Sequence, residues 1–211
     1  MYLFLLMLLL SYLAGSIPSS IITGKVLRGI DIREHGSGNA GGTNVFRVLG
    51  WKAGVFVSLF DVFKGFAATF WISGIAFGFA GFPEETMRLA AGFAAIAGHI
   101  WTVFAGFRGG KGVGTAAGML LALYPLSLLI CFIVFILTFL LTRIVSVSSM
   151  AGAVTLPIVL SVFRFGLLNE VPDSLYYFSF FAAALIIFTH RSNIRRLIDG
   201  TENKFSRKNS A

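Results

Sequence analysis

The sequence predicts an all-helical membrane protein with seven transmembrane helices, its amino end outside the cell and its carboxyl end inside. Of the 211 residues, 56% are hydrophobic and only 12% are charged, whereas soluble domains contain about 25% charged residues. Several apolar stretches exceed the roughly 18 residues that cross a bilayer. Lys and Arg, which give a net charge of +8, lie mainly between these stretches, as in cytoplasmic loops. A soluble globular enzyme is therefore excluded.

The first predicted span covers residues 2–24. Its small residues at the end resemble a secretory signal, but a signal carries positive charge before its apolar run. Here the first basic residue, Lys25, follows the run, so we expect a retained helix. The next apolar runs predict spans over 53–80 and 87–105.

The apolar stretch 113–142 decides the number of spans. As a single helix it would be about 45 Å long, well over a hydrocarbon core of about 30 Å. Pro125 disfavours helix in the residue before it, which predicts two crossings and a short fourth helix over 113–123. The last two spans are expected at 146–165 and 174–190.

Two crossings in this stretch also satisfy the charge distribution. All basic residues except Arg88, Arg164 and Lys64 then lie on the cytoplasmic side. Lys64 lies within a span, and the two outer arginines lie among the acidic residues Glu84, Glu85, Glu170 and Asp173. A single crossing would place the basic tail outside, against the positive-inside bias.

We expect one domain over residues 1–211, with a polar tail over 200–211, in the bacterial cytoplasmic (inner) membrane. The lipid bilayer is thus a partner, and nucleic acid is not, because no basic run stands beside exposed aromatic residues. The single cysteine, Cys131, can form neither an intramolecular disulfide nor a multi-cysteine metal site. The oligomeric state stays open, with a monomer as the working expectation.

Four polar, glycine-containing segments fall on the predicted cytoplasmic face: 30–50, 106–112, 143–149 and 190–202. The first contains His35-Gly-Ser-Gly-Asn-Ala-Gly-Gly-Thr-Asn-Val-Phe-Arg47. Its glycines allow turns that point N–H groups inward, which favours an oxyanion ligand. The spacing of Gly36, Gly38 and Gly41 also matches a dinucleotide fingerprint, but no strand precedes it. A flexible turn that caps a short helix is the alternative.

The second polar segment places Gly109, Gly110 and Lys111 at the start of the short fourth helix. A helix amino terminus carries partial positive charge, so this segment is a candidate phosphate site. It is not a nucleotide P-loop, because Ala105 replaces the first glycine and Gly112 replaces the Ser or Thr that binds magnesium. Alternatively, Lys111 only helps to keep this loop on the cytoplasmic side of the membrane.

Further candidates lie within or at the ends of spans. Asp61 and Lys64 share one helical face, either as a structural ion pair or with Lys64 as a cation for the site. His99 is a candidate ligand or a core histidine, and His190 with Asn193 is a candidate pair or an interfacial anchor. With no metal-binding cluster and no serine nucleophile motif, the site suits the binding of more than one phosphate.

These residues resemble the bacterial membrane glycerol-3-phosphate acyltransferases that use acyl phosphate as donor. Two departures are visible: Thr102 stands where the family usually has proline, and Gly41-Gly42 is richer in glycine than usual. The resemblance extends from the first cytoplasmic loop to the tail. The matching stretches are residues 29–47, 61–65, 98–115 and 190–202, with a serine-rich turn at 146–149.

The resemblance implies acyl transfer from acyl phosphate to the 1-hydroxyl of sn-glycerol 3-phosphate. The products are 1-acyl-glycerol 3-phosphate (lysophosphatidic acid) and phosphate, in the first step of phospholipid synthesis. Since the donor is already activated, we expect no cofactor, no metal and no covalent enzyme intermediate. The family's donor-phosphate site corresponds to Ser37, Gly38, Asn39, Thr43, Gly109 and Gly110, and its glycerol-phosphate site to Arg47, Lys64, Lys111, Ser149, His190 and Asn193.

The candidate catalytic residues are Ser37, Asn39, Arg47, Lys64, His99, Lys111, His190 and Asn193. His99 is expected to orient a substrate or to accept a proton. The general base stays open among His99, His190 and a substrate phosphate. An organophosphate or phosphate transporter is the alternative function, although the inverted repeat typical of many transporters is not visible. A purely structural membrane protein would leave the buried lysine and the glycine loops without a role.

Overall fold

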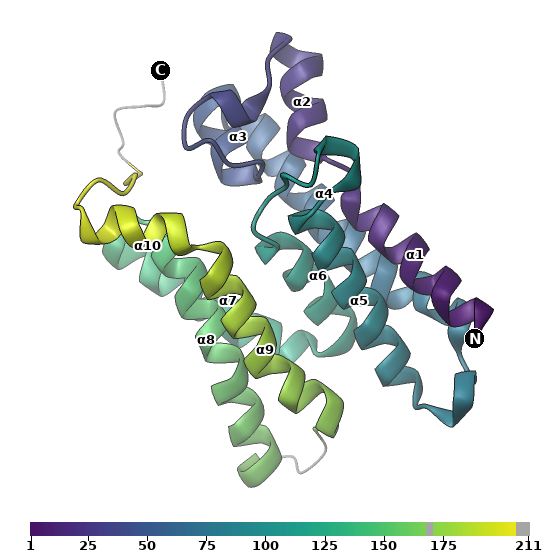
Figure 1. Ribbon diagram of the computed structural model, residues 1–211. Coiled ribbons are helices and arrows are strands. Elements are labelled where there is room, and N and C mark those ends of the chain that lie inside the picture. The colour runs from purple at the N-terminus through teal and green to yellow at the C-terminus, as the bar shows by residue number, and fades with distance from the viewer. Residues whose placement is uncertain (168–170, 206–211) are drawn as a thin grey trace. The chain divides into compact units, whose positions relative to one another are not determined.

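The computed structural model describes residues 1–167 and 171–205, and these residues form helices and loops with no strand among them (Figure 1). The all-helical class is therefore confirmed. Residues 206–211 of the predicted tail, and Glu170 of the predicted outer acidic group, lie outside the described residues. The α-helices are α1 (Tyr2–Ser16), α2 (Ser19–Arg28), α3 (Gly42–Leu49), α4 (Trp51–Phe70), α5 (Glu84–Ile100), α6 (Val113–Leu123), α7 (Pro125–Thr142), α8 (Val145–Val162), α9 (Asp173–Thr189) and α10 (Arg191–Ile198).

Helical segments long and apolar enough to cross a membrane occur at five places in the described chain. They are Tyr2–Arg28, Trp51–Ala76, Glu84–Ala105, Pro125–Thr142 and Val145–Gly166. A sixth results if α9 and α10, which meet at a bend of 57°, form one span. The chain is thus a multi-pass membrane protein.

Two helix breaks shape these spans. The break predicted before Pro125 is confirmed: α6 ends at Leu123, and Pro125 is the first residue of α7, where its missing N–H is tolerated. With 11 residues, α6 is only about 16 Å long. The predicted first span has a break that we did not expect, because Pro18 separates α1 from α2.

The contacts divide the chain into two compact units, one up to Leu123 and one from Tyr124 onward. The first contains α1 to α6, and the second contains α7 to α10. The expectation of a single domain stays a prediction.

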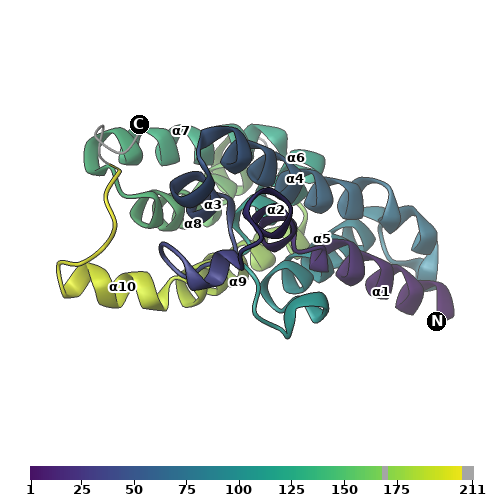
Figure 2. The same ribbon diagram turned by 90° about the horizontal axis from the view of Figure 1, so that it is seen from above.

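In the first unit, α1 runs along α5, and α4 packs against α5 and α6 (Figure 2). Glycine allows α4 and α6 to approach closely. A Cβ atom at Gly65 of α4 would overlap the Thr115 carbonyl group of α6, and one at Gly118 of α6 would overlap the Val62 carbonyl group of α4. Small residues at helix contacts are typical of membrane proteins, where lipid removes the hydrophobic drive for helices to associate.

The loop between α2 and α3 is anchored to the same unit by a small apolar core. Ile32, Val45 and Val57 are fully buried and pack together, which joins this loop to α3 and α4. Burying such side chains stabilises the contact by roughly 1.5–3 kcal/mol each. This core therefore fixes the position of the polar residues that follow Ile32.

In the second unit, α8 packs against both α7 and α9. Residues beyond α10 return to the start of α8: the Phe205 N–H donates to the Arg143 carbonyl oxygen, and the Phe205 ring contacts Phe139 edge-on. At the other end of α9, Arg164 and Asp173 form an ion pair of 2.6 Å.

Candidate active site

The glycine loop over residues 35–41 is shaped by Asn44, which is only 1% exposed. Its amide nitrogen donates to the carbonyl oxygens of Ile32 and His35, both at 2.9 Å, and its oxygen accepts the Ser37 N–H at 2.8 Å. Gly36 has a positive φ of 61°, and a Cβ atom there would overlap the Asn44 side chain. Asn44 is therefore a buried support of the loop.

This loop presents the predicted donor-phosphate residues at the surface of the first unit. Gly38 is exposed, with a positive φ of 73°, and Ser37, Asn39 and Thr43 are partly exposed. Ala40 turns inward and is buried. Hydroxyl and amide groups are thus available to an anion approaching the loop.

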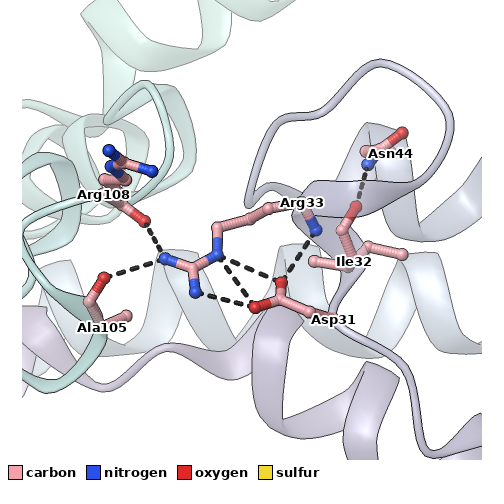
Figure 3. A network of polar contacts seen from close by, with 6 residues as sticks. All are labelled: Asp31, Ile32, Arg33, Asn44, Ala105 and Arg108. Atoms are coloured by element: carbon pink, nitrogen blue, oxygen red, sulfur yellow. Dashed lines mark hydrogen bonds and ion pairs between the residues drawn. The ribbon is translucent and has the colours of Figure 1, made fainter.

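Arg33 joins the first polar segment to the second (Figure 3). Its guanidinium forms an ion pair of 2.7 Å with Asp31 and donates to the carbonyl oxygens of Ala105 at 2.8 Å and Arg108 at 3.3 Å. Hydrogen bonds from Arg33 lower the pKa of Asp31 to about 2, so the pair is charged at neutral pH. Two segments far apart in sequence are therefore held side by side.

Gly109 and Gly110 turn the second polar segment back onto the end of α5. Their N–H groups donate to the carbonyl oxygens of Ile100 and His99, both at 3.0 Å. The first polar segment uses two N–H groups in the same way, since Ser37 donates to Asn44 and Gly38 donates to His35.

The expected part of Gly38, Gly109 and Gly110 in substrate binding stays a prediction, and the structure shows which partners their N–H groups have. A chain that reverses direction beside a helix end must pair its own N–H groups with nearby carbonyl oxygens. The N–H groups of Gly38, Gly109 and Gly110 are engaged in this way. Side chains of the two loops and the amino terminus of α6 are further donors for an anion.

A cluster of buried charges lies behind the two loops. One oxygen of Asp61, Oδ1, is 2.8 Å from Ser19 Oγ, 2.9 Å from Lys64 Nζ and 3.5 Å from His99 Nδ1. The side chains of Asp61, Lys64 and His99 are between 4% and 7% exposed. Lys64 Nζ also donates to the Ile17 carbonyl oxygen at 3.1 Å, which the helix break at Pro18 leaves outside the regular helical pattern.

A small polar pocket opens beside this cluster. It brings together the predicted residues Lys64, His99, Gly109 and Gly110. Its other lining residues are Pro18, Ser19, Ser20, Ala40 and Thr102. Sequence reasoning missed Ser19, which appeared as an ordinary small residue within an apolar run; the adjacent proline was the available signal.

The other two cations predicted for the site in the first unit, Arg47 and Lys111, lie nearer its surface. Arg47 is on α3 and Lys111 lies two residues before α6, and both are partly exposed. Their side chains are long enough to reach a ligand without unpacking a helix.

The second unit holds the predicted residues Ser149, His190 and Asn193, all buried. His190 Nδ1 lies 2.7 Å from the Ile186 carbonyl oxygen, and because a carbonyl only accepts, Nδ1 carries a proton. The Asn193 amide nitrogen donates to Glu202 at 2.6 Å. The predicted meeting of these residues with the cations of the first unit stays a prediction.

Glu202 organises this end of the second unit, a role that we did not predict. Besides Asn193, it accepts hydrogen bonds from Ser146 at 2.8 Å and Arg196 at 2.7 Å. Burial acts to raise the pKa of Glu202, but these hydrogen bonds outweigh it and the pKa lies below the usual value. Glu202 therefore stays ionised at neutral pH and fixes the Asn193 amide.

Multiple apolar helices, combined with glycine loops and a buried cluster of charges, define an integral membrane protein with a cationic polar site. The chain belongs to the glycerol-3-phosphate acyltransferase family, whose model matches residues 5–200. This confirms the family resemblance that the motifs indicated.

Individual relatives agree with this assignment. The glycerol-3-phosphate acyltransferase of Chlorobaculum tepidum is 48% identical over 98% of this chain and 99% of its own length. That of Chlorobium limicola is 47% identical over 95% of each. Among solved structures, PlsY (YgiH), an integral membrane glycerol 3-phosphate acyltransferase, is similar in its glycerol 3-phosphate form, with 36% identity, 96% coverage of both chains and a TM-score of 0.82.

Proposed function

We propose that this protein transfers a fatty acyl group from acyl phosphate to the 1-hydroxyl of glycerol 3-phosphate in the bacterial cytoplasmic membrane. The products are lysophosphatidic acid and inorganic phosphate. The observation that carries this proposal is the near full-length similarity to PlsY structures described in glycerol 3-phosphate and lysophosphatidic acid forms. The buried lysine and histidine beside two glycine loops supply a site of suitable chemistry.

The proposed reaction is a direct transfer. The glycerol hydroxyl attacks the acyl carbonyl carbon, the bond between acyl carbon and phosphate oxygen breaks, and phosphate leaves with the electron pair. The hydroxyl proton passes to a base that is His99, His190 or a substrate phosphate. Because the donor is an activated mixed anhydride, fixed positioning and charge can supply most of the rate.

The residues divide between the two substrates. The side chains of Ser37, Asn39 and Thr43 are proposed to bind the donor phosphate on the loop that contains Gly38. Arg47, Lys64 and Lys111 are proposed to bind the phosphate of glycerol 3-phosphate. The family resemblance assigns Ser149, His190 and Asn193 to the same substrate. Positive charge on Arg47, Lys64 and Lys111 offsets the repulsion between two bound anions.

We further propose seven crossings, with the amino end outside and the carboxyl end inside. The five long segments, the short α6 and α9 supply these crossings, and α10, which meets α9 at a bend of 57°, begins the cytoplasmic tail. α6 can cross only if its neighbours shield it or the bilayer thins, since about 16 Å is less than the hydrocarbon core. This orientation keeps the basic loops inside.

Cysteine labelling tests this topology. In a protein with Cys131 replaced by alanine, single cysteines at the exposed positions Lys52 and Lys204 are expected to react only from the cytoplasmic side. A cysteine at the exposed Glu84 is expected to react only from outside. If α6 does not cross, Lys52 and Lys204 will label from opposite sides.

The glycine loop gives a second test. Ala at position 38 must adopt a positive φ, which costs about 1–2 kcal/mol in a non-glycine residue, whereas Ser37→Ala removes one hydroxyl. We expect Gly38→Ala to impair turnover at least as severely as Ser37→Ala, with a larger rise in KM for acyl phosphate than for glycerol 3-phosphate. Gly29→Ala is the matched control, because Gly29 has a φ of 68° and open space around it. An active Gly38→Ala protein beside an inactive Ser37→Ala protein would make Ser37 a participant in the chemistry.

Reconstituted vesicles separate acyl transfer from transport. Palmitoyl phosphate and glycerol 3-phosphate, added together, are expected to yield phosphate, and neither alone should do so. Uptake of radiolabelled glycerol 3-phosphate into the vesicle lumen without an acyl donor, and without phosphate release, would instead support the transporter alternative.

A further inference from the structure

The buried charge cluster contains a residue for which the proposed reaction gives no role. Asp61 is 4% exposed, and Ser19, Lys64 and His99 all approach the same oxygen, Oδ1. Burying a carboxylate within a membrane span costs free energy, even when the carboxylate is paired. A role for Asp61 in the site would explain why this cost is tolerated. Its partners Ser19, Lys64 and His99 line the polar pocket, whereas Asp61 does not.

The hydrogen bonds that the Lys64 ammonium group donates show how the Asp61 carboxylate orients it. An ammonium group has three N–H donors. Within the described chain, Lys64 Nζ has two partners, Asp61 Oδ1 at 2.9 Å and the Ile17 carbonyl oxygen at 3.1 Å. Two fixed acceptors set the direction of the third donor, on a side chain that lines the pocket.

The same carboxylate also constrains His99. Its Nδ1 is the ring nitrogen that faces Asp61, so a proton on Nδ1 is favoured. Its Nε2 lies on the other side of the ring, against Gly110, where a Cβ atom would overlap it. The imidazole is thus held between α4 and the loop that closes the pocket.

We propose that Asp61, held in place by Ser19, is a positioning residue that aims Lys64 and orients His99 toward glycerol 3-phosphate in the pocket. This inference rests on the proposed function for the identity of the ligand. A purely structural ion pair is the alternative, in which Asp61 serves only to neutralise Lys64 so that α4 can enter the membrane.

A set of three variants distinguishes positioning from neutralisation. Asp61→Asn and Lys64→Met each leave one member of the pair, whereas the double variant Asp61→Asn/Lys64→Met removes both charges and leaves no unpaired ion. The matched control is Glu84→Gln/Arg88→Met, which neutralises an ion pair of 4.0 Å on α5. Thermal unfolding, kcat, and KM for each substrate are measured for all of them, and glycerol 3-phosphate binding is measured by calorimetry without acyl donor.

If Asp61 positions Lys64, the double variant will unfold near the wild-type temperature but bind glycerol 3-phosphate roughly 10–100-fold more weakly, as expected for lost hydrogen bonds to a charged group. Asp61→Asn alone will raise KM for glycerol 3-phosphate more than KM for the acyl donor. In the Lys64→Met background, Asp61→Asn will weaken binding less than it does in the wild-type protein, since part of its effect acts through Lys64. The control pair will bind as wild type does.

The proposal is overturned if the double variant recovers both stability and wild-type glycerol 3-phosphate binding, since the pair would then serve neutralisation alone. It is equally overturned if the losses of binding for Asp61→Asn and Lys64→Met are independent and additive. Calorimetry measures binding without the reaction, so the two proposals can fail separately. If the wild-type protein binds glycerol 3-phosphate but transfers no acyl group, the proposed function is wrong, and the binding of the variants still tests the role of Asp61.

Discussion

Lys111→Ala is expected to reduce kcat/KM by about 10²–10³, the usual loss when one preorganised charged donor is removed from a reacting site. The protein should still fold, because Lys111 is partly exposed and precedes α6 rather than packing within it. The loss should appear mainly as weaker use of glycerol 3-phosphate, to which the proposal assigns this cation. Initial rates over a range of both substrates measure it.

Lys52→Ala is the matched control for this variant. Lys52 is an exposed lysine of the same unit, at the start of α4, and carries no proposed role in the site. Its removal should leave both KM values unchanged. Near-normal activity of Lys111→Ala would show that the second polar segment does not bind a substrate phosphate through this lysine.

Gly110→Ala is expected to reduce turnover by about 10²-fold or more. A Cβ atom at this position would overlap the His99 imidazole and come within 2.8 Å of the Ala40 carbonyl oxygen. Since Ala40 and His99 both line the pocket, the added methyl group must displace the loop or the ring. A displacement of about 1 Å in a reacting site can cost 10²-fold in rate.

Gly74→Ala separates this effect from the general cost of replacing glycine. Gly74 lies in the same unit, and a Cβ atom there meets nothing within 4 Å. We expect this control to keep wild-type activity. Full activity of Gly110→Ala would show that the close approach of His99 to the loop has no part in turnover.

The helical class and most helix positions could be predicted because they depend on local properties. Apolar run length gives the spans, and the restriction that Pro125 imposes on Tyr124 gives the break between α6 and α7. The same restriction by proline could have predicted the break at Pro18. We did not predict it, because Pro18 lies within an apolar run that has no charged residue.

The candidate site was only partly predictable. Residue type identified Lys64, His99 and the glycine loops, since a buried lysine and clustered glycines are unusual in apolar spans. Sequence could not show that Asn44 is turned inward or that Arg33 reaches the carbonyl oxygens of Ala105 and Arg108. Those contacts depend on how distant segments pack, which no local pattern contains.

The most direct test of the proposed reaction is the donor and product balance of the purified protein in lipid vesicles. With palmitoyl phosphate and glycerol 3-phosphate, we predict equimolar lysophosphatidic acid and inorganic phosphate, with no phosphate released when glycerol 3-phosphate is omitted. Palmitoyl-coenzyme A in place of palmitoyl phosphate should give no product. Lysophosphatidic acid formed from palmitoyl-coenzyme A, or a stoichiometric burst of phosphate without glycerol 3-phosphate, would contradict direct transfer from acyl phosphate.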